Sequence, residues 1–313
     1  MAKIDKAYAK IINNIFLDGF DYKDETRNQI RTQIYSDQLV YNAEEFASIK
    51  DNFPVLTSKK IVWKSVVTEL LWFLRGEQNL EFLHEHNVHI WDKDMEAFAK
   101  RAHLDTNEKY VGRIYGAQWR DFAYAIDQIN LLMTNLRKYP LGTRHIVTAW
   151  NPKDLQNMAL PPCHWSFEVL VAPDIYEDGQ QKGYKFALKW HQRSVDTFLG
   201  LPFNIASYAL LGCIIEACTG YRFETLIGDL SNVHIYHGHI KQCTMMVDRA
   251  DNQYKAPKLR FSTNAEILFT DVKNQKFDLV DIVYKLKPDD FILDNYENWG
   301  KVEAEMYAPI AKS

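Results

Sequence analysis

The stretch that most constrains the fold runs from Phe203 to Ala217, because its residues are apolar around almost the whole helical circumference. A helix without a polar side has to be enclosed by other elements, so this stretch predicts a central, buried helix. Gly220 follows it as a helix stop. The apolar run is interrupted by Ser207 and Glu216 and falls short of the roughly 20 residues that a membrane span needs. The stretch therefore predicts the interior of a soluble protein.

Shorter patterned segments supply the elements that would enclose this helix. Strands are predicted at residues 38–41, 145–150, 165–171, 184–190, 222–227 and 259–261. Helices are predicted at residues 7–17, 62–74, 80–85, 126–139 and 240–249. Turn signals at Asp178-Gly179 and Lys182-Gly183 predict a hairpin between the strands at 165–171 and 184–190. Because strands and helices do not alternate strictly, the pattern predicts an α+β fold.

The chain shows no Gly/Ser-rich or proline-rich linker, so residues 1–313 are predicted to form one domain. Residues 20–36 are polar and poorly patterned. Residues 93–110 are charged and lack a clear apolar periodicity, which predicts a surface insertion or lid.

Charge and cysteine content narrow the function classes. The net charge is −4 and the pI is about 6.2, which argues against a non-specific DNA or RNA coat and against a polybasic membrane patch. Binding of a small anionic ligand remains possible, because it needs only a few local arginines. The 4 cysteines show no paired C-x-x-C spacing, and no signal peptide is visible. A reduced, cytoplasmic protein is therefore expected.

Cys163 is the strongest candidate for a reactive group. It follows Pro161 and Pro162, which hold the approach to it extended and stiff. A nearby arginine lowers a thiol pKa, and Arg193 is the candidate for that role. His164 is adjacent, and neighbours on a strand point to opposite faces, so it is a poor general base for Cys163. Addition of the thiolate to an electron-poor double bond fits this arrangement better than the acyl transfer of a Cys–His hydrolase.

Two further residues have both a structural and a chemical interpretation. Glu69 lies in a mostly apolar helical stripe. It is either a helix-surface glutamate or a half-buried carboxylate with a raised pKa. Tyr115 is either a structural residue of a turn or a buried tyrosine that acts in proton transfer.

Polar residues around the next strand and helix are suited to an anionic, hydrogen-bonding ligand. Arg193 and Ser194 can bind an anion together where a strand ends. Asn204 is either a helix N-cap or an amide that reads a base edge with its adjacent donor and acceptor. His234 and Tyr236 share one strand face, which suits hydrogen bonds to a sugar hydroxyl. Zinc sites use closely spaced histidines, but no carboxylate or cysteine accompanies this cluster at a regular spacing, so no metal is predicted.

Sequence blocks over most of the chain resemble the thymidylate synthase family. The blocks are Glu69–Leu74, His89–Asp92, Tyr115–Arg120, Arg144–Pro152, Met158–His164, Gln192–Asp196 and Leu199–Tyr208. The resemblance implies reductive methylation of deoxyuridine monophosphate (dUMP), with 5,10-methylenetetrahydrofolate as one-carbon and hydride donor. Cys163 would add to C6 of the uracil and so make C5 nucleophilic. The implied fold is a large mixed β-sheet covered by helices and stacked on its twin in a homodimer.

The resemblance also implies a role for each candidate residue. Glu69 would organise proton transfer at O4 of the uracil and at the folate, and Tyr115 would assist proton removal from C5. The implied dUMP-binding residues are Arg193, Ser194, Asn204, His234, Tyr236 and, from the partner subunit, Arg144. The implied folate-binding residues are Trp91, Asp196, Leu199, Gly200, Phe203 and, at the glutamate tail, Lys59.

Several positions depart from the family pattern. The N-terminal phosphate-binding loop lacks its usual glycines, and either Arg27 or Arg31 would supply its charge. Asp94 stands where a second tryptophan is usual, and Thr143 replaces one of two consecutive arginines. The closing-tail motif Ala308–Ala311 is extended by two residues. An altered tail that admits water favours the alternative activity, a folate-dependent pyrimidine-nucleotide hydroxymethylase. A non-catalytic relative that binds nucleotide or RNA is the third possibility.

Overall fold

The computed structural model describes residues 3–25, 27–176 and 179–307, and the tail motif at Ala308–Ala311 lies outside the described residues. The strands are β1 Phe20–Asp24, β2 Gln29–Asn42, β3 Ile146–Thr148, β4 His164–Ile175, β5 Gln181–Gln192, β6 Val195–Asp196, β7 Arg222–Tyr236, β8 Lys258–Phe261 and β9 Phe291–Asp294. The helices are α1 Lys3–Asp18, α2 Trp63–Arg75, α3 Glu81–Glu85, α4 Asp92–Ala102, α5 Tyr115–Arg120, α6 Gln128–Lys138, α7 Gly200–Thr219, α8 Ile240–Arg249, α9 Thr263–Lys273 and α10 Leu279–Ile282.

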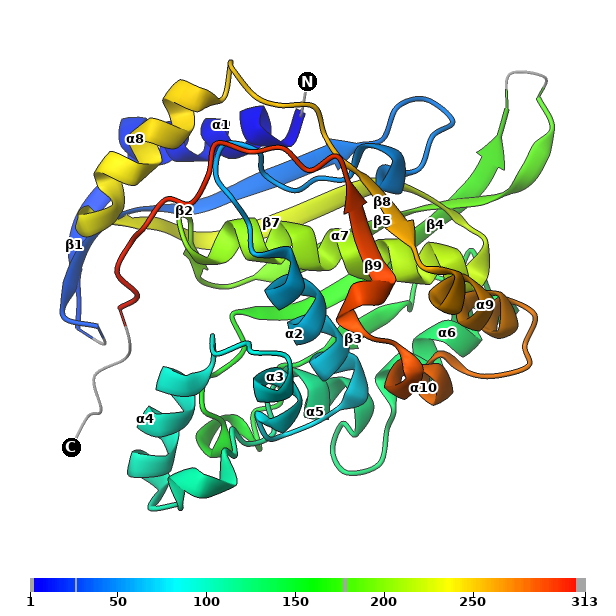
Figure 1. Ribbon diagram of the computed structural model, residues 1–313, viewed down its shortest axis with the longest axis horizontal. Coiled ribbons are helices and arrows are strands. Elements are labelled where there is room, and N and C mark those ends of the chain that lie inside the picture. The colour runs from blue at the N-terminus through cyan, green and yellow to red at the C-terminus, as the bar shows by residue number, and fades with distance from the viewer. Residues whose placement is uncertain (1–2, 26, 177–178, 308–313) are drawn as a thin grey trace.

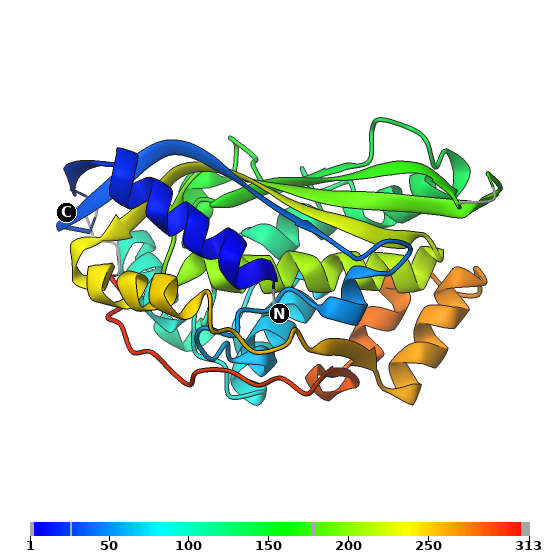
Figure 2. The same ribbon diagram turned by 90° about the horizontal axis from the view of Figure 1, so that it is seen from above.

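Seven strands form one mixed sheet in the order β1-β2-β7-β5-β4-β3, with β6 pairing to β7. The β5–β7 and β6–β7 pairs are parallel, and the others are antiparallel. Most helices gather on one face of this sheet (Figures 1 and 2). The predicted α+β fold with a large mixed sheet is confirmed, and so is the hairpin that joins β4 to β5.

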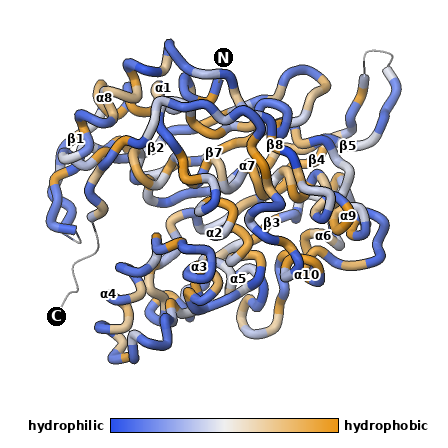
Figure 3. The backbone as a smooth tube through the Cα atoms, in the orientation of Figure 1, coloured by the Kyte–Doolittle hydropathy of each residue, from blue (hydrophilic) through white to orange (hydrophobic). Residues whose placement is uncertain are grey.

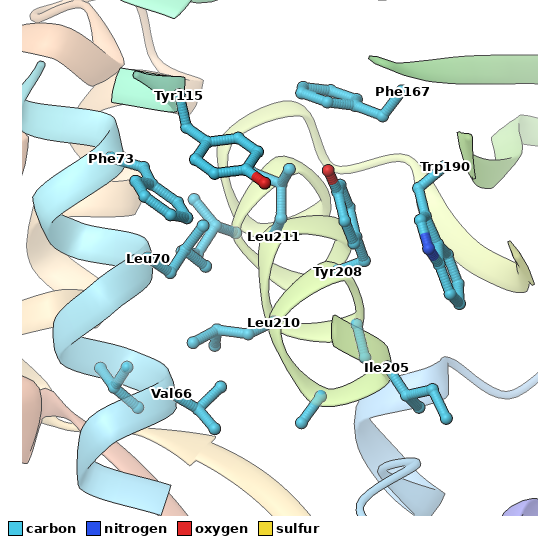
Figure 4. Close-up of a cluster of buried hydrophobic side chains, with 14 of the residues drawn as sticks. Val66, Leu70, Phe73, Tyr115, Phe167, Trp190, Ile205, Tyr208, Leu210 and Leu211 are labelled. Atoms are coloured by element: carbon cyan, nitrogen blue, oxygen red, sulfur yellow. The ribbon is translucent and has the colours of Figure 1, made fainter. Parts of the chain in front are cut away.

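Helix α7 lies at the centre, as its apolar circumference predicts. It packs between the inner face of the sheet and α2, where Tyr208 meets Trp190 of β5 in a stacked pair with ring centroids 5.3 Å apart (Figure 4). The helix is long and apolar enough to cross a membrane, but 78% of its apolar window is buried inside the structure. The hydropathy colouring shows the same burial, with apolar segments gathered around α7 and polar ones outside (Figure 3). Helix α7 is therefore a core helix.

Gly212 provides the close approach between α7 and the sheet. A Cβ at this position would overlap the ring of Phe223, and that ring is held in a stack with Phe186 at 4.9 Å between centroids. A Gly→Ala change in a helix gains about 1 kcal/mol of propensity, whereas overpacking a core costs about 1–3 kcal/mol. Steric overlap with a ring that cannot move should outweigh the gain in propensity.

We therefore expect Gly212→Ala to lower the free energy of unfolding by roughly 1–2 kcal/mol, measured by urea titration. Because the cost comes from the ring of Phe223, the same change made in a Phe223→Leu background should be neutral or stabilising. An equal loss in both backgrounds would show that Phe223 is not the cause.

Two segments differ from the sequence-based expectation. Residues 20–36, which show little pattern, form β1 and most of β2. The interpretation that residues 93–110 lack apolar periodicity is wrong, because α4 buries Met95, Phe98 and Ala99 at helical spacing. Three buried positions suffice for a helix on the edge of the molecule, where its other sides face water. The role of residues 93–110 as a lid stays a prediction.

Candidate active site

One cavity of about 370 Å³ opens where the ends of β4, β5 and β7 meet the N-terminus of α7. Helix α2, the turn between β1 and β2, and the C-terminal residues Met306 and Tyr307 complete its wall. Most of the predicted site residues line it, namely Arg27, Glu69, Trp91, Tyr115, Cys163, Ser194, Asp196, Leu199, Gly200, Phe203, Asn204, His234 and Tyr236. Segments far apart in the sequence thus share one cavity.

Backbone hydrogen bonds fix Cys163 on both sides. Its N–H donates to the Tyr115 hydroxyl at 2.8 Å, and its carbonyl accepts from the backbone N–H of Arg193 at 2.8 Å. Burial raises the pKa of the Cys163 thiol, although Arg193 and Arg27 oppose the rise. Arg193 thus acts on the thiol pKa in the predicted direction, but the loss of hydration on burial outweighs the attraction of the cations, so the net shift is upward.

Arg193 braces the stiff approach to Cys163. Its guanidinium donates to the carbonyls of Pro162 at 2.9 Å and Pro161 at 2.8 Å. The arginine thereby supplies donors to two consecutive carbonyls of the loop that leads to Cys163. Of the residues that the structure describes, Arg193 is not among those on the cavity wall.

His164 is not placed to serve as a base. It lines the cavity together with Cys163, but its ring is held by other partners. Its Nδ1 lies 2.8 Å from the Tyr208 hydroxyl, and its ring stacks on Tyr115 with centroids 4.0 Å apart. Burial lowers its pKa to about 3, so the imidazole stays neutral at physiological pH. These contacts disfavour a Cys–His hydrolase.

Glu69 is a buried carboxyl group rather than a helix-surface residue. It projects from α2 into the cavity, and Oε1 accepts a hydrogen bond from the Trp91 indole N–H at 2.7 Å. Burial raises the pKa of Glu69 to about 7, and the bond from Trp91 only partly opposes the rise. A carboxyl group that titrates near neutral pH can both give and take a proton during a reaction.

Asn204 lies inside α7, whose N-cap is Leu199, so the N-cap interpretation is wrong. Its Oδ1 accepts from the Gln192 side-chain amide at 3.1 Å, and Gln192 accepts in turn from the Trp190 indole at 3.1 Å. This chain fixes which way the Asn204 amide faces. Within the part of the chain that the structure describes, the Asn204 amide nitrogen has no hydrogen-bond partner, so a donor is left for a ligand.

The end of β7 presents His234 and Tyr236 to the cavity. His234 donates through Nδ1 to the Asn232 carbonyl at 2.8 Å, which makes Nε2 the acceptor, and the Arg31 guanidinium lies 3.4 Å from Nε2. The pKa of His234 is lowered to about 4, mainly by burial and then by Arg31. The His234 imidazole is therefore neutral, which suits a hydrogen bond to an uncharged sugar hydroxyl.

The structure separates the two N-terminal arginines. Arg31 is buried and pairs with Asp24 at 3.2 Å, because the register of β2 places it between Tyr22 and Tyr236. Arg27 lies in the turn and lines the cavity. Its Nε donates to the carbonyl of Tyr307 at 2.9 Å. Of these two arginines, Arg27 is thus the one that lines the cavity.

The C-terminal segment closes the same end of the cavity. It leaves β9 and crosses to the side of α8 and β1 (Figures 1 and 2). The Tyr307 ring stacks on His239 with centroids 5.2 Å apart, in a space that a side chain at Gly238 would fill. His239 also lies 2.9 Å from the Glu305 carbonyl through Nε2. Sequence reasoning missed Tyr307, for which the tail motif that follows it was the available signal.

Three predicted residues do not reach the cavity wall, as far as the described chain shows. Lys59 is buried, donates to the Phe198 carbonyl, and has its pKa lowered to about 8 by burial. Arg144 is exposed before β3, and Arg193 is the third. In the opposite sense, Gln192 and Asp94 line the cavity without having been predicted as site residues.

Comparison with known proteins gives one consistent result. The sequence model of the thymidylate synthase family matches residues 6–308. A thymidylate synthase of Enterobacteria phage T4 is 34% identical over 96% of this chain and 99% of its own length. One of Mesoplasma florum is 31% identical with the same coverage. A probable thymidylate synthase of Escherichia phage T5 is 41% identical over 77% of this chain and 82% of its own length. The chain belongs to the thymidylate synthase family and is an enzyme that transfers a methyl group.

Proposed function

We propose that this enzyme converts dUMP to thymidylate, with 5,10-methylenetetrahydrofolate as one-carbon and hydride donor and dihydrofolate as second product. The observation that carries the proposal is that Cys163, Asn204 and the Glu69–Trp91 pair surround one cavity. This combination offers a nucleophile, a reader of the base edge and a proton-transfer group. The family takes dUMP and methylenetetrahydrofolate as substrates, and both fit the chemistry of the wall.

In this proposal the nucleotide occupies the end of the cavity near Cys163. The thiolate adds to C6 of the uracil, and Asn204 donates its free amide N–H to the base edge. Ser194 and Arg27 bind the phosphate, and His234 and Tyr236 bind the 3′-hydroxyl. The bound phosphate attracts the Arg27 side chain. It also binds Arg193 once that guanidinium releases the two proline carbonyls. Tyr115, which already holds the backbone of Cys163, is next to C5 and assists loss of its proton.

The folate occupies the more apolar end of the same cavity. Trp91, Leu199 and Phe203 offer flat or apolar surfaces for its ring system. Asp196 accepts from the backbone N–H groups of Phe198 and Leu199 at 3.0 Å each, which fixes this carboxylate and the start of α7. Lys59 would meet the glutamate tail only after a rearrangement, since it is buried here.

The proposal includes a cytoplasmic homodimer of single-domain subunits, in which the open sheet face packs on its twin. Large apolar side chains are exposed on this face, among them Val40, Ile146 and Leu170. Exposed apolar surface of this kind is typical of an interface. Arg144 is exposed and outside its own cavity, as a residue that serves the partner's phosphate site would be.

The second candidate function is the hydroxymethylase, in which water traps the one-carbon unit at C5. Asp94 favours it, because a carboxylate lines the cavity beside Arg27 where a tryptophan is usual in the family. A carboxylate can bind and orient a water molecule that an indole would exclude.

Product analysis decides between the two functions. The enzyme is incubated with dUMP and methylenetetrahydrofolate, and nucleotides and folates are separated by chromatography. We expect thymidylate and dihydrofolate in equal amounts, in the wild type and in Asp94→Asn alike. A 5-hydroxymethyl nucleotide with tetrahydrofolate, reduced in Asp94→Asn, would replace the proposal with the hydroxymethylase.

A further inference from the structure

A cluster of metal-ligating side chains lies outside the cavity, at the corner between α3 and α4. We propose that His84, His89 and Asp92 bind one divalent transition-metal ion, zinc being the best match. Nε2 of His84 lies 2.7 Å from one carboxylate oxygen of Asp92, and Nδ1 of His89 lies 2.9 Å from the other. The ligand atoms of the three residues all lie within 4.8 Å of one another.

These separations are close to those around a bound ion. Zinc takes imidazole nitrogen and carboxylate oxygen at about 2.0–2.2 Å, so two ligands in a tetrahedral site lie about 3.5 Å apart. The two histidines already meet the carboxylate inside that range, with ring centroids 4.8 Å apart. The ion would take the place between each ligating nitrogen and Asp92 that a hydrogen-bonding proton now holds, and each imidazole would bind it as a neutral ring with its proton on the other nitrogen. Small side-chain rotations would complete three bonds.

The ligand set and its exposure select the kind of ion. Two imidazoles and one carboxylate suit zinc and neighbouring transition metals, whereas magnesium and calcium prefer all-oxygen sites. The His89 side chain is 54% exposed and that of Asp92 32%, so an ion can enter and keep water at its remaining position. The histidine cluster near β7 lacks this geometry, because no such group is found there among the described residues.

The site is separate from the reaction. None of the three ligands lines the cavity in the described part of the chain, so the prediction of a metal-free reaction is unaffected. Asp92 directly follows Trp91, whose indole holds Glu69. An ion at this corner would therefore tie α3, the loop 86–91 and α4 together beside the cavity.

Metal titration of the full-length protein tests the site. The protein is stripped with a chelator and titrated with zinc by calorimetry, in the wild type and in a Cys163→Ser background that removes the reactive thiol as a competing ligand. We expect one equivalent to bind in both, with at least about tenfold weaker binding in His84→Gln and in Asp92→Asn. Binding should also raise the melting temperature of the wild type, and cobalt should give the visible absorption of a four-coordinate ion.

His86→Asn is the matched control, because His86 lies in the same loop but its Nδ1 lies 2.9 Å from the Phe82 carbonyl and it is outside the group of three ligands. It should bind zinc as the wild type does. Asp92→Asn keeps a hydrogen-bonding side chain of the same shape and is therefore expected to fold. Circular dichroism confirms its folding before the titration. Failure of the wild type to bind a stoichiometric ion, or equal affinity in His84→Gln, would refute the site.

Discussion

Cys163→Ser is expected to lower turnover by about 10⁴-fold or more while nucleotide binding is retained. Removal of the nucleophile of a covalent mechanism has an effect of this size or larger. The serine keeps the backbone bonds to Tyr115 and Arg193, but a hydroxyl is ionised far less readily than a thiol. The measurement is steady-state turnover, with dUMP affinity followed by calorimetry.

Cys218→Ser is a control for the loss of a thiol as such. Cys218 is buried in α7 away from the cavity, so this variant should lose some stability and keep its catalytic rate. Turnover of Cys163→Ser equal to that of the wild type would refute the nucleophile assignment. A wild type that binds dUMP but turns nothing over would instead indicate the non-catalytic relative.

Glu69→Gln is expected to make the protein more stable at alkaline pH and far less active. The glutamine still accepts the Trp91 indole N–H, but it carries no exchangeable carboxyl proton. Loss of a positioned acid–base group lowers turnover by about 10²- to 10⁴-fold. The activity of the wild type should change across a pKa near 7, and this pH dependence should be absent from the residual activity of the variant.

Whereas Glu69→Gln should lower the activity, it should raise the free energy of unfolding at alkaline pH. Burial raises the pKa of Glu69 from 4.5 to about 7, so the native state holds its proton where the unfolded chain has lost it. Its contribution to stability is present below pH 4.5 and is lost as pH rises to about 7. The difference corresponds to roughly 3 kcal/mol. Urea titrations at pH 4.5 and pH 8 should show the variant gaining that much on the wild type, and an unchanged difference would show that Glu69 is not buried as a neutral acid.

Local pattern predicts those parts of the fold in which one segment carries its own signal. Helix α7 could be predicted because its whole circumference is apolar, and β4 and β5 because turn residues separate two apolar runs. Strand β1 and the first part of β2 could not, because several of their apolar residues, Ile30 and Tyr35 among them, are exposed and give no alternation. Helix α4 buries only one narrow side, which charged neighbours conceal in the sequence.

The site divides in the same way. The two prolines before Cys163 show in the sequence that it is presented stiffly, and motif resemblance identifies Asn204 and Glu69. The balance between burial and arginine at the thiol depends on tertiary packing and is invisible in the sequence. Register decides between Arg27 and Arg31, since β2 turns Arg31 inward onto Asp24. The Asn204–Gln192 bond likewise joins two elements that only the fold brings together.

The most direct test of reductive methylation follows the hydride. Methylenetetrahydrofolate that carries deuterium at C6 of its pterin ring is incubated with dUMP and the enzyme, and the nucleotide product is examined by mass spectrometry. The account predicts thymidylate with one deuterium in its methyl group and dihydrofolate without the label. A 5-hydroxymethyl nucleotide without deuterium, with the label retained in tetrahydrofolate, would contradict it.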